Sequence, residues 1–131
     1  MLKSKEDKMN NTTKVTVIVL AAILALTAVG AHLSNTEFYT PNFISVIYGM
    51  ASVCIFDAEY TEINSSPLIL MTDTKGRSTI EDYLLSHGGY TMTEQLGASY
   101  IFENDTHVMH VSHDTKIFCM IWIIEEPEPK K

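Results

Sequence analysis

Hydrophobic residues are unevenly distributed along the chain, and one long run near the N-terminus holds a large share of them. The run "KVTVIVLAAILALTAVGAHLS" has no charged residue between Val15 and Ala31, and Thr16 and Thr27 are the only polar side chains there. A helix needs about 20 apolar residues to cross the hydrocarbon core of a bilayer, with about 17 as a lower limit. Because backbone groups in lipid must bond within their own segment, the run predicts a transmembrane helix over residues 15–33.

A polar leader, residues 1–14, precedes the run and carries four lysines, Lys3, Lys5, Lys8 and Lys14. After the run, no lysine or arginine occurs until Lys75. Lys and Arg residues that flank a membrane segment stay on the cytoplasmic side. We therefore expect a single-pass protein of the cell membrane, with a cytoplasmic N-terminus and a C-terminal domain outside.

The same pattern has a second interpretation, a signal peptide that is cleaved near Ala31 to give a secreted domain. The basic leader suits it, and the small residues of "AVGA" offer a cleavage site after Gly30 or Ala31. Against it, the leader contains Glu6 and Asp7, and the apolar core of a signal peptide has only about 7 to 15 residues. We favour an uncleaved signal anchor that contacts the bilayer through residues 15–33, and both interpretations place the domain across the membrane.

The residues after the run begin with a predicted polar stalk over residues 34–44 and continue as a domain over residues 45–125. A stretch rich in β-branched and aromatic residues predicts a strand near Val46–Phe56, with a bulge at Gly49. A short apolar run, Leu68–Thr72, is typical of a buried strand.

One amphipathic helix is predicted in "RSTIEDYLLSHGG". Its cap is Ser78 or Thr79, its apolar stripe contains Ile80 and Leu84, and the glycine pair that follows supplies the stop.

Four further segments, "YTMTEQL", "SYIFE", "HVMHVSH" and "KIFCMIWII", predict strands separated by turn-forming clusters. Trp122 lies in the last of them, where both faces are apolar, as in a central strand covered on each side. This order of elements predicts an α+β fold, with an antiparallel sheet packed on one helix. The charged, proline-containing residues 126–131 are expected to be a disordered tail.

The motifs "YTEI", "SPLILM", "YLLSHGGY" and "GASYIFEN", followed by a tryptophan in the last strand, carry a resemblance to a known group. The chain resembles small uncharacterised single-pass membrane proteins of Gram-positive bacteria. The resemblance covers most of the residues after the apolar run. It implies the same layout, an anchor followed by an outer domain, and it implies no activity.

The stretch "HVMHVSHD" contains the candidate metal ligands, His107, His110, His113 and Asp114. Zinc needs three or four ligands within about 2.0 to 2.3 Å. Along a strand the side chains alternate, so His107 and His113 share one side about 20 Å apart, and His110 points to the other. This geometry favours structural or surface histidines, because a metal site would need a ligand from a neighbouring strand. We expect His110, which is flanked by Val108 and Val111, to touch the core or a partner strand.

Cys54 and Cys119 are a disulfide candidate, because an extracytoplasmic compartment permits the bond. The alternative is that each is a small buried hydrophobic residue, as free cysteines in apolar runs usually are. The disulfide requires the two Cα atoms to lie within about 4.4 to 6.8 Å of each other.

The net charge of −7 disfavours nucleic-acid binding, because phosphate backbones would be repelled. No motif implies a cofactor or a catalytic residue. We therefore expect a membrane-anchored binding or interaction domain with a protein partner in the membrane or envelope, and not an enzyme. Two alternatives remain, a metal-binding or sensory domain that uses His107–His113 and an enzyme with an unrecognised site.

Overall fold

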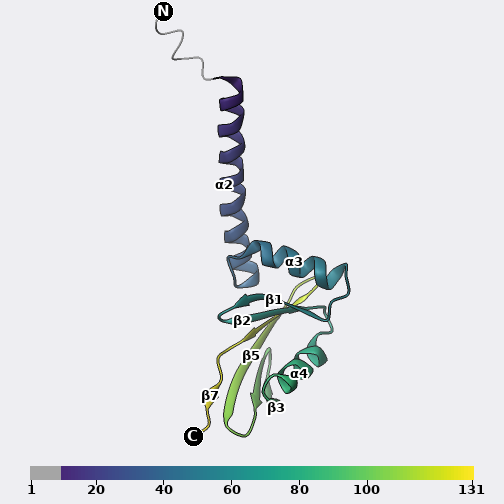
Figure 1. Cartoon of the computed structure of the whole chain (residues 1–131). Helices are drawn as coiled ribbons and strands as arrows, with labels where there is room; N and C mark the ends of the chain where they lie inside the picture. The colour runs from purple at the N-terminus through teal and green to yellow at the C-terminus, as the bar shows by residue number, and fades with distance from the viewer. Residues whose placement is uncertain (1–9) are drawn as a thin grey trace, which may run out of the picture. The chain divides into compact units, whose positions relative to one another are not determined.

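The computed structural model describes residues 10–131, which divide into two compact units with the boundary in the sequence after Pro41 (Figure 1). The described part of the first unit contains one helix, α2, over Asn11–Phe38. The second unit, Asn42–Lys131, contains two helices and a β-sheet. Most of the leader predicted over residues 1–14 lies outside the described residues.

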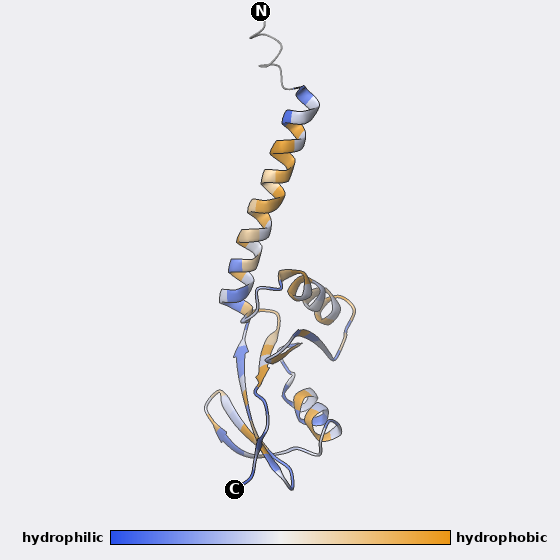
Figure 2. Ribbon diagram, turned by 60° about the vertical axis from the view of Figure 1, so that its left-hand side comes forward, coloured by the Kyte–Doolittle hydropathy of each residue, from blue (hydrophilic) through white to orange (hydrophobic). Residues whose placement is uncertain are grey.

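Helix α2 is long and apolar enough to cross a membrane. It has 28 residues, and its apolar side chains are exposed all round, for example Ile18, Leu24 and Leu26. Figure 2 shows hydrophobic residues along most of its length and hydrophilic residues at both ends. A helix without a polar face fits surroundings that are themselves apolar.

The segment predicted as a stalk, residues 34–44, is not extended. Helix α2 continues through it to Phe38, because nothing in the sequence breaks the helix before Pro41. Tyr39 then adopts a left-handed conformation with φ 63°, and the hydroxyl of Ser34 donates to the carbonyl oxygen of Thr40 at 2.6 Å. A tight turn therefore ends α2, and a new helix begins a few residues later.

The strand predicted near Val46–Phe56 is wrong, because these residues form helix α3, Phe43–Cys54. The side chain of Asn42 caps its N-terminus by accepting from the backbone N–H of Ser45 at 3.3 Å. The buried residues Val46, Gly49 and Val53 recur at helical spacing. Burial on one face of a helix has thus overridden the β propensity of the individual residues.

Within residues 10–131, seven strands form one sheet, whose main path has the order β1-β2-β6-β5-β4-β3. Neighbouring strands are antiparallel, which confirms the predicted sheet type and the α+β class. The strands are β1 (Tyr60–Ser65), β2 (Leu68–Thr72), β3 (Thr91–Leu96), β4 (Ser99–Glu103), β5 (His107–Thr115), β6 (Met120–Ile124) and β7 (Glu128–Pro129).

Two helices cover opposite faces of the sheet, where the sequence predicted one helix on one face. Side chains alternate along β2, so Leu70 and Met71 lie on opposite faces. Leu70 belongs to the core cluster that includes Ile80 of helix α4. Helix α3 packs on β1 and β2 on the other face (Figure 1). Gly49 of α3 lies against Met71 there.

Helix α4, Arg77–Ser86, forms where the sequence predicted a helix, and Gly88 and Gly89 end it with positive φ angles of 129° and 71°. The start of α4 differs from the prediction of a Ser78 or Thr79 cap. Gly76 is the N-cap, and no side chain caps the helix. Arg77, which precedes the two predicted caps, is already helical and pairs with Glu81 at 3.2 Å.

Strand β6 lies between β2 and β5 and is buried on both faces, as predicted from its apolar pattern. Trp122 is 1 % exposed, and its indole N–H donates to the Thr72 hydroxyl at 2.9 Å. The C-terminal residues 126–131, expected to be disordered, include strand β7, which pairs with the start of β5. Backbone pairing with β5 holds this segment against the sheet, and the composition of the segment does not reveal that pairing.

Candidate functional site

A pocket of about 340 Å³ opens between helix α4, the turn that joins β1 to β2, and the segment that follows β6. Apolar side chains from different strands and from the helix form its interior, among them Leu68, Leu84, Met109 and Ile124. Leu84, Met109 and Ile124 belong to the core cluster, and Leu68 packs against it. The pocket is therefore an opening in the core on the face of the sheet that α4 covers.

Pairing between strands brings these residues together. Leu68 and Ile124 are direct partners in the register of β2 and β6, and Val111 of β5 is opposite Ile124 on its other side. Side chains two residues apart point to the same face, so Met109 reaches the pocket beside them. The volume lies near the lower end of the range for ligand sites, about 300 to 1,000 Å³.

Two aromatic rings on α4 and just after it line one side of the pocket. The rings of Tyr83 and His87 are stacked, with centroids 4.0 Å apart and 17° between their planes. Tyr60 meets Tyr83 edge-on at 5.1 Å. Burial, the nearby phenol of Tyr60 and the carboxylate of Glu62 all raise the pKa of Tyr83, so its hydroxyl stays protonated at neutral pH.

The hydrogen bonds of His87 define its tautomer. Its Nδ1 lies 2.8 Å from the carbonyl oxygen of Tyr83 and 3.0 Å from the Ser86 hydroxyl; because a carbonyl oxygen can only accept, the shorter contact requires a hydrogen on Nδ1. In the neutral ring Nε2 is then an acceptor. The imidazole thus offers one acceptor atom beside a mainly apolar surface.

The opposite rim is acidic. Glu125 and Glu126 line the pocket directly after β6, and both are exposed. The backbone N–H of Glu125 donates to the carbonyl oxygen of His110 at 3.0 Å, which fixes this segment against β5. A group that combines an apolar body with a positive charge would complement this pocket.

The expected orientation of the histidines on β5 is wrong. The buried residues of β5 are Met109 and Val111, so the face with odd residue numbers is the core face. His110 has an even number, so its side chain points away from the core face, and it is exposed. Helix α3 packs on β1 and β2, and His110 on this face of β5 remains exposed.

His113 instead lies among aromatic side chains on the core face. Its ring stacks on Tyr100, with centroids 5.4 Å apart, and is tilted against Trp122 at 5.0 Å. Its Nδ1 is buried and has no hydrogen-bond partner within the described part of the chain. His113 therefore contributes to packing.

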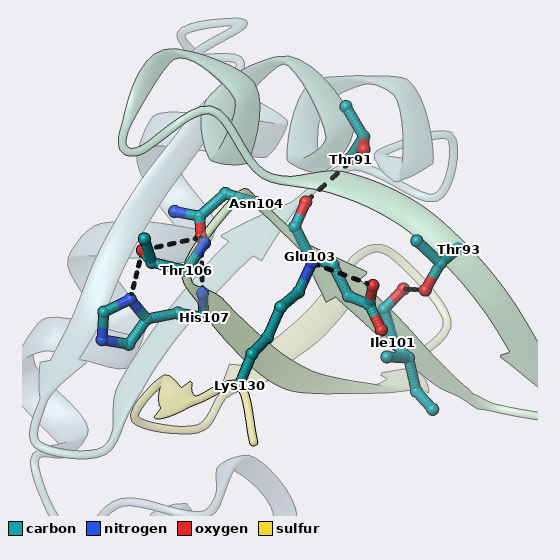
Figure 3. A network of polar contacts seen from close by, with 8 residues as sticks. All are labelled: Thr91, Thr93, Ile101, Glu103, Asn104, Thr106, His107 and Lys130. Carbon is teal, nitrogen blue, oxygen red and sulfur yellow. Dashed lines mark hydrogen bonds and ion pairs between the residues drawn. The ribbon is translucent and has the colours of Figure 1, made fainter.

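His107 is the first residue of β5 and directly follows the turn from β4 (Figure 3). The side-chain oxygen of Asn104 accepts from the backbone N–H groups of Thr106 and His107, at 3.0 and 2.7 Å. The ring of His107 is hydrogen-bonded to the Thr106 hydroxyl at 2.7 Å. Beside this turn, Lys130 pairs with Glu103 at 3.5 Å and fastens the C-terminal segment.

The candidate metal ligands do not converge. His110 and His113 point to opposite faces, and Asp114 pairs with Lys116 at 3.1 Å. Over residues 10–131, no three His, Cys, Asp or Glu side chains are placed so that they could hold one metal ion.

Cys54 and Cys119 come close together, as free thiols. Cys54, at the end of α3, is exposed, and its thiol lies 3.6 Å from the carbonyl oxygen of Phe118. Cys119 is buried, and its pKa is raised by that burial and by the proximity of Cys54. A disulfide between them stays a prediction.

No family model, curated protein or solved structure matches this chain. Any function must therefore be inferred from the residues and the geometry described above. The pocket was not predicted, because its residues are far apart in the sequence. The one local signal of the pocket in the sequence is "SPLILM", because the buried strand β2 in this motif begins at Leu68, which lines the pocket.

Proposed function

We propose that this chain is a membrane-anchored, extracytoplasmic binding domain that holds an apolar side chain of a partner protein in the pocket beside α4. The observation that carries the proposal is the opening in the core, about 340 Å³ in volume, with an apolar interior and an acidic rim. The partner segment is then an apolar residue with a lysine or arginine next to it.

The apolar helix α2 supports the membrane anchor, and the four lysines before it support a cytoplasmic N-terminus. An uncleaved anchor keeps the domain at the membrane, where envelope proteins are available as partners. The exposed carboxylates of Glu125 and Glu126 support a lysine or arginine in the partner segment, because charges on the rim of an interface guide association and select partners.

A peptide selection tests this function. The full chain in lipid nanodiscs would be presented with a random peptide library, and selected peptides titrated by calorimetry. We expect the selected sequences to share an apolar residue beside a lysine or arginine. Leu68→Trp, which narrows the pocket, should weaken their binding at least about tenfold, which corresponds to about 1.4 kcal/mol.

The matched control is Leu96→Trp, which adds the same side chain at an exposed position outside the pocket. It should leave the affinity unchanged. Replacing Glu125 and Glu126 together by Gln should weaken binding and reduce its dependence on salt. Equal affinities for the wild type and Leu68→Trp would contradict the proposal.

A further inference from the structure

The domain has a second unusual feature, a surface of exposed hydrophobic residues at α3 and the β5–β6 turn. Scattered exposed apolar side chains are normal, but a cluster indicates an interaction site. Cys54 of α3 lies 3.6 Å from the carbonyl oxygen of Phe118, so the two elements adjoin. We call the following residues, each at least 61 % exposed, the apolar surface: Ile44, Ile47, Tyr48, Ile55, Phe56, Ile117 and Phe118.

Helix α3 is apolar on both sides. Val46, Gly49 and Val53 face β1 and β2 and are buried. Ile44, Ile47 and Tyr48 recur at helical spacing on the opposite side and are exposed. No charged residue occurs from position 38 to position 56. Nothing in the domain covers this exposed side of α3. Its contact with water is unfavourable, because the side chains are apolar.

The connection to α2 restricts where α3 can be. Residues 39–42 alone separate the end of α2 from the start of α3. Four extended residues reach at most about 15 Å. The headgroup layer on each side of a bilayer is on the order of 5 to 8 Å thick. If α2 spans a membrane over residues 15–33, its last five residues add about 7.5 Å at 1.5 Å per residue and cross the headgroup layer, so α3 starts within about 15 Å of the outer edge of that layer.

We propose that the apolar surface docks on the outer leaflet of the bilayer that α2 crosses, with α3 lying in the interface. The proposal rests on the membrane anchoring proposed above. Aromatic residues such as Tyr48 and Phe118 suit the headgroup level, where apolar and polar surroundings meet. The surface contains no lysine or arginine, so it needs no anionic lipid and its attachment is insensitive to salt.

Docking in this way would leave the pocket open. Helix α3 packs on the face of β1 and β2 that carries Met71, and the pocket lies on the opposite face of the sheet, which α4 covers. The bilayer then holds the domain by its α3 side, while the acidic rim at Glu125 and Glu126 stays accessible to a partner.

Tryptophan fluorescence tests the docking. The full chain would be reconstituted in phosphatidylcholine vesicles, with and without brominated acyl chains, which quench indoles that they contact. The variants are Tyr48→Trp and Phe118→Trp on the apolar surface, and Leu96→Trp as a matched exposed control. The native Trp122 is buried and gives a constant background.

We expect brominated lipid to remove about half or more of the added emission for Tyr48→Trp and Phe118→Trp, and to leave that of Leu96→Trp unchanged. A fourth variant, Leu24→Trp, reports on α2 itself. If Leu24→Trp is not quenched, the membrane anchoring fails, and the docking fails with it.

If Leu24→Trp is quenched but Tyr48→Trp and Phe118→Trp are not, the anchor stands and the docking is refuted. A second outcome would also refute the docking: the emission of Tyr48→Trp is blue-shifted, is not quenched, and depends on the protein-to-lipid ratio. A second copy of the chain would then cover the apolar surface. Quenching at both positions in 0.1 M and in about 1 M salt, where screening is strong, supports the proposal.

Discussion

At the scale of the residue, position within the pleat decides what each side chain of β5 does. His110 and His113 are three residues apart and therefore have opposite orientations. His113 packs against Tyr100 and Trp122, while His110 is exposed on the other face of the sheet. Chemically identical side chains thus differ in their contribution to stability.

We expect His113→Asp to destabilise the domain and His110→Asp to have little effect. The first change loses the ring contacts and places a carboxylate among aromatic side chains, where even a neutral polar group without a partner costs about 1 to 3 kcal/mol. The second change is on the surface and should stay within about 0.5 kcal/mol. Thermal unfolding of the full chain in detergent, followed by circular dichroism, measures both.

His113→Phe is the control, because it keeps the ring contacts and removes the unpaired Nδ1. It should retain the stability of the wild type. A larger loss for His110→Asp than for His113→Asp would show that the face assignment of β5 is inverted.

At the scale of the element, α3 is held by close approach to the sheet. A Cβ atom added at Gly49 would lie 2.9 Å from Cγ2 of Ile63, and Ile63 is 1 % exposed. Ile63 is branched at Cβ and enclosed, so it cannot yield. Glycine is required here for packing against β1, and not for a bulge in a strand.

We therefore expect Gly49→Ala to destabilise the domain, although alanine favours a helix over glycine by about 1 kcal/mol. Overpacking a tight contact costs about 1 to 3 kcal/mol, so the clash should outweigh the propensity. Ile47→Ala, on the exposed side of α3, is the control and should change stability little. Urea unfolding in detergent compares them, and a more stable Gly49→Ala would mean that α3 does not approach β1 this closely.

At the scale of the whole molecule, charge and hydrophobicity divide the chain into a basic leader, an apolar helix and an acidic domain. This division is the basis for the proposed orientation, because flanking Lys and Arg residues are retained in the cytoplasm.

A reporter that is active only outside the cytoplasm, fused after Lys131, should be active. Leu24→Arg should impair membrane retention, since a charge at the centre of a span costs about 2.5 to 3.5 kcal/mol on insertion scales. Leu96→Arg, in the outer domain, should not. Activity of the fusion only in the cytoplasm would refute the orientation, and loss of an N-terminal tag from the mature protein would favour the cleaved signal.

Local signals were sufficient for a substantial part of this fold. The apolar run, the helix that Gly88 and Gly89 terminate, and the strand around Trp122 are each recognisable from neighbouring residues. Each forms the predicted type of element, with different bounds: the first helix covers Asn11–Phe38, and the last strand begins only at Met120. Each depends on contacts within a few residues or on uniform burial, and a sequence pattern records both directly.

The tertiary structure decided the rest, because long-range burial selects among the conformations that a segment can adopt. Residues 46–56 have β-branched side chains that suit a strand, but the surface of β1 and β2 accepts them as a helix with Val46, Gly49 and Val53 inward. The orientation of β5 depends on which face of the sheet α4 covers, and the last residues are ordered by pairing with β5. The pocket exists only because the register of β2 and β6 places Leu68 beside Ile124, a contact between residues that are far apart in the sequence.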